Sequence, residues 1–195
     1  MNDALKNKWD QRYAKAETPG QPSDILLQNN HLLPSEGTAL DLACGLGANA
    51  LLMAEHGLDT HAWDLSNVAM EKLQGFAAER GLSVKAQTKD IQAEPPQAAS
   101  LDVLVIAHFL ERDMRDVLIE ALHPGGMLFY QTFIQDKVDS GGPSNPDFLL
   151  ATGELLQQWG CAPMRPLVYR EEGCFGDTSR GWRNRAMLVA VKDAS

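Results

Sequence analysis

Short apolar runs alternate with one-sided amphipathic segments along this chain, and the alternation restricts the fold more than any other feature of the sequence. Residues 101–107 (LDVLVIA) are almost all apolar, as expected of a strand buried on both faces. Strands that alternate with helices predict a three-layer α/β fold with a mostly parallel sheet and right-handed crossovers. The segments that we predict as strands are 38–43, 60–64, 83–88, 101–107, 127–134, 166–171 and 186–192.

Helices are predicted between these runs by spacing and by glycine terminators. Residues 114, 117, 118, 121 and 122 are apolar at helical spacing, and Ser66 is a good N-cap for the segment that ends at Gly81. Further helices are expected over 47–56 and 152–159. His123-Pro124-Gly125-Gly126 predicts a sharp turn, and the polar stretch 135–147 predicts a loop.

Length and charge limit the classes of partner. A chain of 195 residues fits a single domain, 1–195, and its formal net charge is −9. The acidic balance argues against broad contact with nucleic acid or with an anionic membrane. The first 13 residues lack the apolar core of a secretory signal, and the longest apolar run is too short to span a bilayer.

The three cysteines indicate a reducing compartment. Cys44, Cys161 and Cys174 are odd in number and far apart, which suits neither a disulfide framework nor a zinc site. No two histidines have the spacing of metal ligands on one helix face. We therefore expect a cytoplasmic protein without a bound metal.

The segment 40–50 (LDLACGLGANA) is the most informative for function. A strand ends, two glycines follow, and a helix begins, which allows a ligand to approach the backbone beside the free N–H groups of the helix. As Gly-x-Gly-x-x-Ala it is a degenerate dinucleotide fingerprint. The alternative is a tight strand-to-helix turn that binds nothing.

Polar residues at the ends of the other predicted strands support a ligand site. Asp64 ends the second strand, Asp90 follows the third, and His108 follows the fourth. The carboxyl ends of parallel strands share one sheet edge, where open sheets bind their ligands. Taken alone, Asp64 could equally be a helix cap or an exposed charge.

With these motifs the chain resembles the class I S-adenosylmethionine-dependent methyltransferases, from about Trp9 to Lys192. The stretch 41–47 (DLACGLG) is similar to that family's first motif, in which an acid precedes the glycine loop. The stretch 123–128 (HPGGML) is similar to the turn before the fifth strand. The resemblance implies a Rossmann-like methyltransferase fold, with a seven-stranded, mostly parallel sheet and an antiparallel last strand.

Within that class the chain is most similar to the small tellurite-resistance and thiopurine-type methyltransferases. The likeness rests on segments 9–13 (WDQRY), 62–64 (AWD), 142–146 (GPSNP) and 153–155 (GEL). Tellurite-type members often carry arginine where this chain has Ala48, and some have a His-Arg pair that is missing before the last predicted strand. Both departures count against tellurite as the substrate.

The resemblance also implies residue roles. The cofactor would be S-adenosyl-L-methionine, with S-adenosyl-L-homocysteine as the product. Residues 1–33 would form a helical lid, and 135–165 a loop and helix on the substrate side. Asp64 would hold the ribose, and Asp90 and the backbone of Ile91 would bind the adenine. The cofactor-binding set is Arg12, Tyr13, Asp41, Ala43, Cys44, Gly45, Gly47, Asp64, Leu65, Asp90, Ile91 and His108.

Methyl transfer from this cofactor needs little further activation by the protein, because a sulfonium methyl group is already electrophilic. The enzyme must hold the nucleophile close to the methyl group and exclude water. A general base is needed only when the nucleophile carries a proton, and His108 is our candidate. The alternative is that His108 hydrogen-bonds a loop or packs beside Phe109.

Five of the nine arginines lie in the last 31 residues, and this basic cluster could face an anionic substrate. We assign Arg180 and Arg183 to that role; a solvated basic face is the alternative. The predicted reaction is methyl transfer to a small molecule, such as a thiol or a chalcogen, by a monomer or homodimer. A nicotinamide-dependent oxidoreductase and a non-catalytic S-adenosylmethionine-binding protein remain open as other functions.

Overall fold

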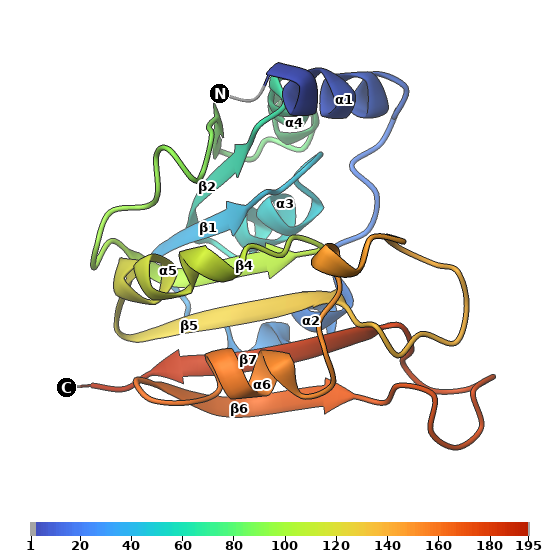
Figure 1. The fold of residues 1–195 in the computed structure, drawn as a ribbon. Coiled ribbons are helices and arrows are strands. Elements are labelled where there is room, and N and C mark those ends of the chain that lie inside the picture. The colour runs from blue at the N-terminus through green and yellow to red at the C-terminus, as the bar shows by residue number, and fades with distance from the viewer. Residues whose placement is uncertain (1–2, 195) are drawn as a thin grey trace.

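A seven-stranded sheet runs through the centre of the computed structural model, which describes residues 3–194 (Figure 1). The strand order is β3-β2-β1-β4-β5-β7-β6, and β7 is antiparallel to both of its neighbours while the other neighbouring pairs are parallel. The predicted fold class is therefore confirmed. The strands are β1 (Thr38–Leu42), β2 (Asp59–Asp64), β3 (Val84–Thr88), β4 (Leu101–Ala107), β5 (Leu122–Phe133), β6 (Met164–Glu171) and β7 (Arg185–Lys192).

Helices cover both faces of this sheet and give the three layers. In Figure 1, α5 and α6 lie in front of the sheet, while α2 and α3 lie behind it. The helices are α1 (Asp3–Ala14), α2 (Asp24–Asn29), α3 (Ala48–Glu55), α4 (Asn67–Glu79), α5 (Arg115–Ala121) and α6 (Glu154–Trp159), with short 3-10 turns η1 (Asn30–Leu32), η2 (Arg112–Met114) and η3 (Pro146–Phe148). Every helix within residues 3–194 is too short or too polar to cross a lipid bilayer.

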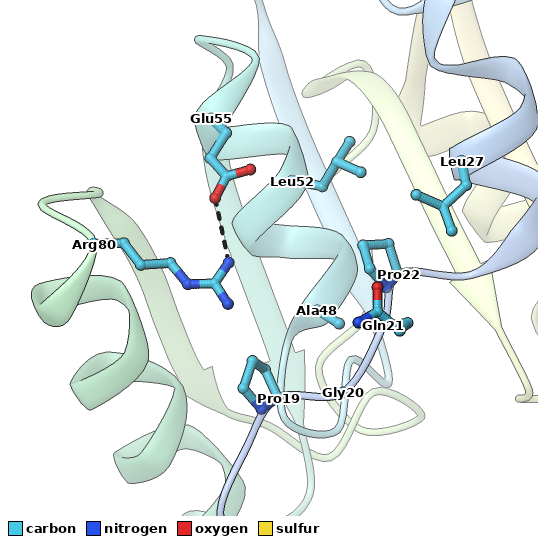
Figure 2. Close-up of a pocket in the computed structure, with 9 residues that line it drawn as sticks. All are labelled: Pro19, Gly20, Gln21, Pro22, Leu27, Ala48, Leu52, Glu55 and Arg80. Carbon is cyan, nitrogen blue, oxygen red and sulfur yellow. Dashed lines mark hydrogen bonds and ion pairs between the residues drawn. The ribbon is translucent and has the colours of Figure 1, made fainter.

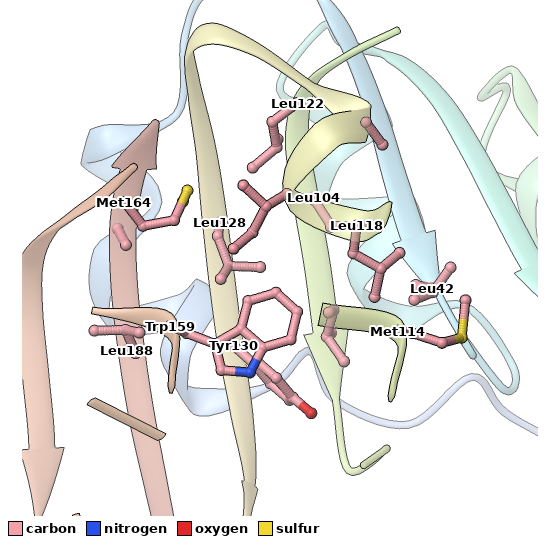
Figure 3. Packing of buried hydrophobic residues seen from close by; sticks show 14 of the residues in the cluster. Leu42, Leu104, Met114, Leu118, Leu122, Leu128, Tyr130, Trp159, Met164 and Leu188 are labelled. Atoms are coloured by element: carbon pink, nitrogen blue, oxygen red, sulfur yellow. The ribbon is translucent and has the colours of Figure 1, made fainter. Parts of the chain in front are cut away.

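The front face holds the largest apolar cluster, which Figure 3 shows from close by. Tyr130 of β5 lies at its centre and meets Trp159 of α6 edge to face, with ring centroids 5.2 Å apart. Aromatic pairs in this arrangement contribute about 0.5–1.5 kcal/mol beyond the burial of their surfaces. The cluster therefore ties α6, near the end of segment 135–165, to the middle of the sheet.

The N-terminal 33 residues divide into two parts with different environments. No residue of α1 is buried. In α2, by contrast, Ile25 and Leu26 have no exposed surface and pack into the core behind the sheet. Helix α1 therefore lies on the surface and α2 belongs to the core layer, while the role of residues 1–33 as a lid stays a prediction. Residues 1, 2 and 195 of the predicted domain lie outside the described residues.

The predicted turn at 123–126 lies inside a strand rather than before one. Leu122 pairs with Leu101, and the next pair joins Met127 to Val103, so the four residues between them bulge out of β5. Gly125 has a φ of 82°, which explains why the bulge contains glycine. The sequence therefore located the bend correctly but placed the start of the strand too late.

Candidate functional site

The glycine loop joins β1 to α3 at the carboxyl edge of the sheet. Ala43, Gly45 and Gly47 all have positive φ angles, of 54°, 54° and 75°. The N–H of Cys44 donates to the carbonyl of Trp63, at 3.0 Å, and ties the loop to β2. A left-handed conformation is unfavourable for Ala43 by roughly 1 kcal/mol, so the loop keeps this shape because neighbouring contacts impose it.

Asp64 connects the end of β2 to this loop. The N–H of Gly45 donates to Asp64 Oδ2 at 2.8 Å, and the N–H of Ser66 donates to Oδ1 at 2.9 Å. Burial raises the pKa of Asp64, and the backbone hydrogen bonds oppose that rise. Each carboxylate oxygen can accept two hydrogen bonds, so Asp64 can still accept from the hydroxyl groups of a ligand.

Asp41 is directed toward the start of α3. Its Oδ2 accepts from the N–H of Ala50 at 3.1 Å, and its Oδ1 lies 3.5 Å from Asn49 Nδ2. Asn49 Oδ1 in turn accepts from the N–H and the hydroxyl of Ser23, at 2.8 and 2.9 Å. Burial raises the pKa of Asp41 to about 7. The acid of the glycine motif therefore joins β1, α3 and the start of α2.

Helix α1 brings Tyr13 to the glycine loop. A Cβ atom on Gly45 would lie 2.9 Å from the Tyr13 hydroxyl oxygen, so a side chain there would displace the tyrosine, and the φ of 54° also favours glycine. Burial and the charge of Asp64 raise the pKa of Tyr13. Arg12, by contrast, is exposed, and its guanidinium lies over the Trp9 ring, 5.3 Å from the centroid. The structure thus brings Tyr13 to the predicted site and leaves Arg12 on the outside.

Polar contacts with α4 hold α1 in this position. Asp10 Oδ1 accepts from the Ser66 hydroxyl at 2.5 Å and from the N–H of Val68 at 3.3 Å. At the other end of α1, Lys72 Nζ donates to the carbonyls of Ala14 and Ala16, at 2.8 and 2.5 Å. An acid therefore meets the N-terminus of α4 and a base meets the C-terminus of α1, where helix dipoles favour these charges.

The residues predicted to bind adenine lie beside β2. The N–H of Lys89 donates to the carbonyl of Asp64 at 2.9 Å, which places the chain leading to Asp90 at the same edge. Ile91 is buried in the front cluster, and Leu65 is half-buried. Trp63 Nε1 is the one buried side-chain nitrogen or oxygen within residues 3–194 without a hydrogen-bond partner.

His108 and Gln131 meet at the end of β4. The N–H of His108 donates to the Gln131 carbonyl at 2.9 Å, and Gln131 Nε2 lies 3.1 Å from His108 Nε2. The His108 ring also packs against Phe133, with centroids 5.1 Å apart, rather than against its neighbour Phe109. Partial desolvation and nearby Arg185 lower the pKa of His108, and Asp24 raises it. His108 is exposed and reaches the same sheet edge as Asp64.

Arg183 lies at the centre of the loop between β6 and β7. Its guanidinium donates to the carbonyls of Gly173, Phe175, Asp177 and Arg180, at 2.6–2.9 Å. These bonds occupy most of its donors, so Arg183 holds the loop together. The Arg180 side chain is exposed. The Arg183 guanidinium is therefore engaged within the loop while the Arg180 side chain is exposed, and the role of both residues toward a substrate stays a prediction.

A second arginine organises the segment 135–165, for which we predict a position on the substrate side. Arg112 donates to both carboxylate oxygens of Glu154, at 2.6 and 3.0 Å, and to the carbonyls of Asp147 and Leu149. Fork-shaped pairing of this kind is strong and directional. It fixes η3 and the start of α6 beside the chain that follows β4. The predicted loop therefore lies on the same side of the molecule as His108.

A shallow pocket also opens beside α3, shown in Figure 2. Its wall includes the exposed ion pair between Arg80 and Glu55, at 3.2 Å. None of the residues that we predict for the cofactor or the substrate lines this pocket. Within residues 3–194, no group of His, Cys, Asp and Glu side chains is arranged to hold a metal ion.

Comparison with known proteins gives a partial sequence match and an extensive structural one. Residues 39–126 match a family described as a methyltransferase domain. Over 64 residues the chain is 38% identical to 2-heptyl-1-hydroxyquinolin-4(1H)-one methyltransferase of Mycobacteroides abscessus. This match covers 33% of the present chain and 28% of the relative, so the aligned region spans less than a third of either protein.

Most of the chain has the same fold as solved structures. A SAM-dependent methyltransferase from Methanosarcina mazei matches with a TM-score of 0.68 at 16% identity, over 90% of this chain and 100% of the other. TehB from Haemophilus influenzae matches with a TM-score of 0.69 at 23% identity, over 95% and 67%. The chain has the Rossmann-like methyltransferase fold. In this methyltransferase fold the glycine loop, Asp64 and His108 occupy one edge of the sheet.

Several residues of this edge were not assigned to the site from the sequence. Ser66, Asn49, Ser23 and Gln131 link the predicted residues to one another through hydrogen bonds. Gln131 was the easiest of these residues to find from the sequence, because it is a polar residue inside the predicted strand 127–134. In the structure its side chain has no exposed surface. A buried polar side chain in a central strand requires partners, and here those partners belong to the site.

Proposed function

We propose that this protein is a class I methyltransferase that transfers a methyl group from S-adenosyl-L-methionine to a small molecule. The observation that carries the proposal is the bond from the N–H of Gly45 to Asp64, which joins a glycine loop to an acid at the carboxyl ends of adjacent strands. The methyltransferase-domain match over 39–126 and the shared fold support the same reading.

The residues at this edge fit the cofactor. When bound, S-adenosyl-L-methionine supplies an electrophilic methyl group on its sulfonium. Asp64 retains acceptor capacity for the two ribose hydroxyls, and the loop backbone from Ala43 to Gly47 would lie against the methionine part. Asp90, Ile91 and Leu65 would contact the adenosine. Tyr13 would close over the loop, and Arg12 would need to leave the Trp9 ring to reach the cofactor carboxylate.

The acceptor that we propose is a small thiol or chalcogen compound. The partial relative is named for a small heterocyclic acceptor, 2-heptyl-1-hydroxyquinolin-4(1H)-one, which supports a small molecule in general. In the same proposal His108 lies near the transferred methyl group, and Arg180 with Arg183 lies on the anion-attracting side. We further propose a cytoplasmic monomer or homodimer; all three cysteines are free thiols in the structure.

Ligand-induced stabilisation tests the cofactor assignment. We expect S-adenosyl-L-homocysteine at 100 times its Kd to stabilise the native state by about 2.7 kcal/mol, with no shift from NAD or NADP. Stabilisation by a nicotinamide cofactor alone would establish the oxidoreductase alternative. An unchanged melting temperature with adenosylhomocysteine would overturn the proposal.

An acceptor screen with methyl-labelled S-adenosyl-L-methionine then tests catalysis. The panel contains small thiols, selenium and tellurium oxyanions, and N-hydroxyquinolinones. We expect label transfer to at least one thiol or chalcogen compound. Transfer only to the quinolinones would retain the enzyme and replace the acceptor class. Cofactor binding without transfer to any acceptor would favour the non-catalytic binding protein.

A further inference from the structure

The position of His108 is fixed by strand β5. His108 has a φ of 59°, in the left-handed region that residues other than glycine rarely adopt. Its N–H donates to the carbonyl of Gln131, and the hydroxyl of Tyr130 donates to the carbonyl of Phe109 at 3.0 Å. Two consecutive residues of β5 therefore hold the chain on which the His108 ring is mounted.

The orientation of the Gln131 amide is also fixed. Gln131 Oε1 accepts from the N–H of Ile25 at 2.8 Å, and this N–H belongs to the first turn of α2, where backbone donors have no partner within the helix. The opposite amide orientation would place two donors against each other. Nε2 is therefore the amide group that faces His108.

This orientation determines the tautomer of the His108 ring. Gln131 Nε2 can only donate, so His108 Nε2 must accept, and in a neutral ring the proton is then on Nδ1. The His108 side chain is exposed, and no residue among 3–194 hydrogen-bonds to Nδ1. On this exposed side chain, Nδ1 therefore carries an N–H group and not a lone pair.

We propose that Gln131 is a positioning residue that keeps His108 in the Nδ1–H form, so that His108 donates a hydrogen bond to the methyl acceptor instead of removing a proton from it. The role toward the acceptor rests on the proposed function, whereas the tautomer does not. A donor at this place selects acceptors whose reacting atom carries no proton at neutral pH, so within the proposed acceptor class it favours chalcogen oxyanions over thiols, which are mostly protonated at that pH. Such acceptors also need a second oxygen or nitrogen that can receive the N–H.

The tautomer is read directly by NMR of protein labelled with ¹⁵N-histidine, with the His108 signals assigned from their loss in His108→Asn. We expect a protonated Nδ1 and an unprotonated Nε2 at neutral pH, which reverses the preference of free histidine in water. Gln131→Glu should move the proton to Nε2, because a carboxylate can only accept. Gln87→Glu, an exposed change of the same kind on β3, should leave the His108 signals unchanged. An Nε2–H form in the wild-type protein would overturn the proposal.

Kinetics with the acceptor found by the screen test whether His108 donates a hydrogen bond to that acceptor. Asparagine can donate from the place of Nδ1 and tolerates a positive φ, so His108→Asn should retain activity within about tenfold of wild type. His108→Ala should lose on the order of 100-fold. Equal losses of 100-fold or more in both variants, when thermal melts show that both are folded, would identify His108 as a general base and refute the donor role. Failure of all cofactor binding would refute the proposed function while leaving the NMR result interpretable.

Discussion

Replacement of Asp64 by alanine should damage both the fold and the cofactor site, and the two effects can be separated. Asp64 is 6% exposed and accepts from two backbone N–H groups, those of Gly45 and Ser66. Each donor left without a partner costs roughly 1–2 kcal/mol, so Asp64→Ala should lower the free energy of unfolding by about 2–4 kcal/mol. Loss of the ribose contacts should weaken S-adenosyl-L-homocysteine binding by tenfold or more, about 1.4 kcal/mol.

Asp102 offers a matched control at the opposite edge of the sheet. Its Oδ2 accepts from the N–H of Thr38 at 2.7 Å, so Asp102→Ala should cost stability without changing cofactor affinity. Urea denaturation measures the free energy of unfolding, and isothermal titration calorimetry measures the affinity of the folded fraction. An affinity for adenosylhomocysteine within twofold of wild type in folded Asp64→Ala would refute the ribose role. An unchanged free energy of unfolding would refute the hydrogen-bond reasoning.

Three further perturbations test how the site is held. The pKa of Asp41 is raised to about 7 in the folded protein. Between pH 4 and pH 7 the folded protein therefore binds more protons at Asp41 than the unfolded chain does, so the free energy of unfolding should fall as the pH rises. Urea denaturation at pH 5 and pH 8 should show this loss, roughly 2–3 kcal/mol, in wild type and not in Asp41→Asn; equal pH dependence in both proteins would exclude Asp41 as its source. Lys72→Met removes the donor to the carbonyls of Ala14 and Ala16, so amide hydrogen exchange in α1 should accelerate on the order of tenfold. The control Lys85→Met breaks an exposed ion pair elsewhere and should leave the exchange rate in α1 unchanged. Arg112→Lys loses the fork to Glu154, and limited proteolysis within 146–153 should become faster than in Arg80→Lys; equal rates would show that the fork does not order this segment.

The layers of the fold could be predicted because the relevant signals are local. A run such as LDVLVIA predicts a strand buried on both faces whatever its partners, and Ser66 acts as the N-cap that its residue type suggests, accepting from the N–H of Ala69 at 3.1 Å. Asp64 and the glycine loop could be placed at one edge because parallel strands align their carboxyl ends. The bond between Gly45 and Asp64 follows from that alignment.

The connections between site residues could not be predicted, because they join segments far apart in the chain. Nothing near Gln131 in the sequence indicates that its amide bridges His108 to the first turn of α2, 106 residues away from Gln131. The burial of α2 was missed for the same reason, because Ile25 and Leu26 form too short an apolar pattern to indicate what they pack against. The contacts of Arg183 could not be predicted either, because the carbonyls that its guanidinium engages belong to a loop without a regular pattern, and its role toward a substrate stays a prediction.

The place of β7 in the sheet also affects the order in which the chain can fold during its synthesis. Residues 185–192 are translated after every other strand, yet β7 lies between β5 and β6. While the ribosome is still making residue 184, β6 has no strand to pair with, and the side of β5 that faces β7 remains open. The five neighbouring strands β3, β2, β1, β4 and β5 can assemble earlier. The nascent protein therefore contains the sheet edge that we propose for the cofactor before the sheet is complete. A chaperone that shields unpaired strands would therefore act on β5 and β6 in this interval.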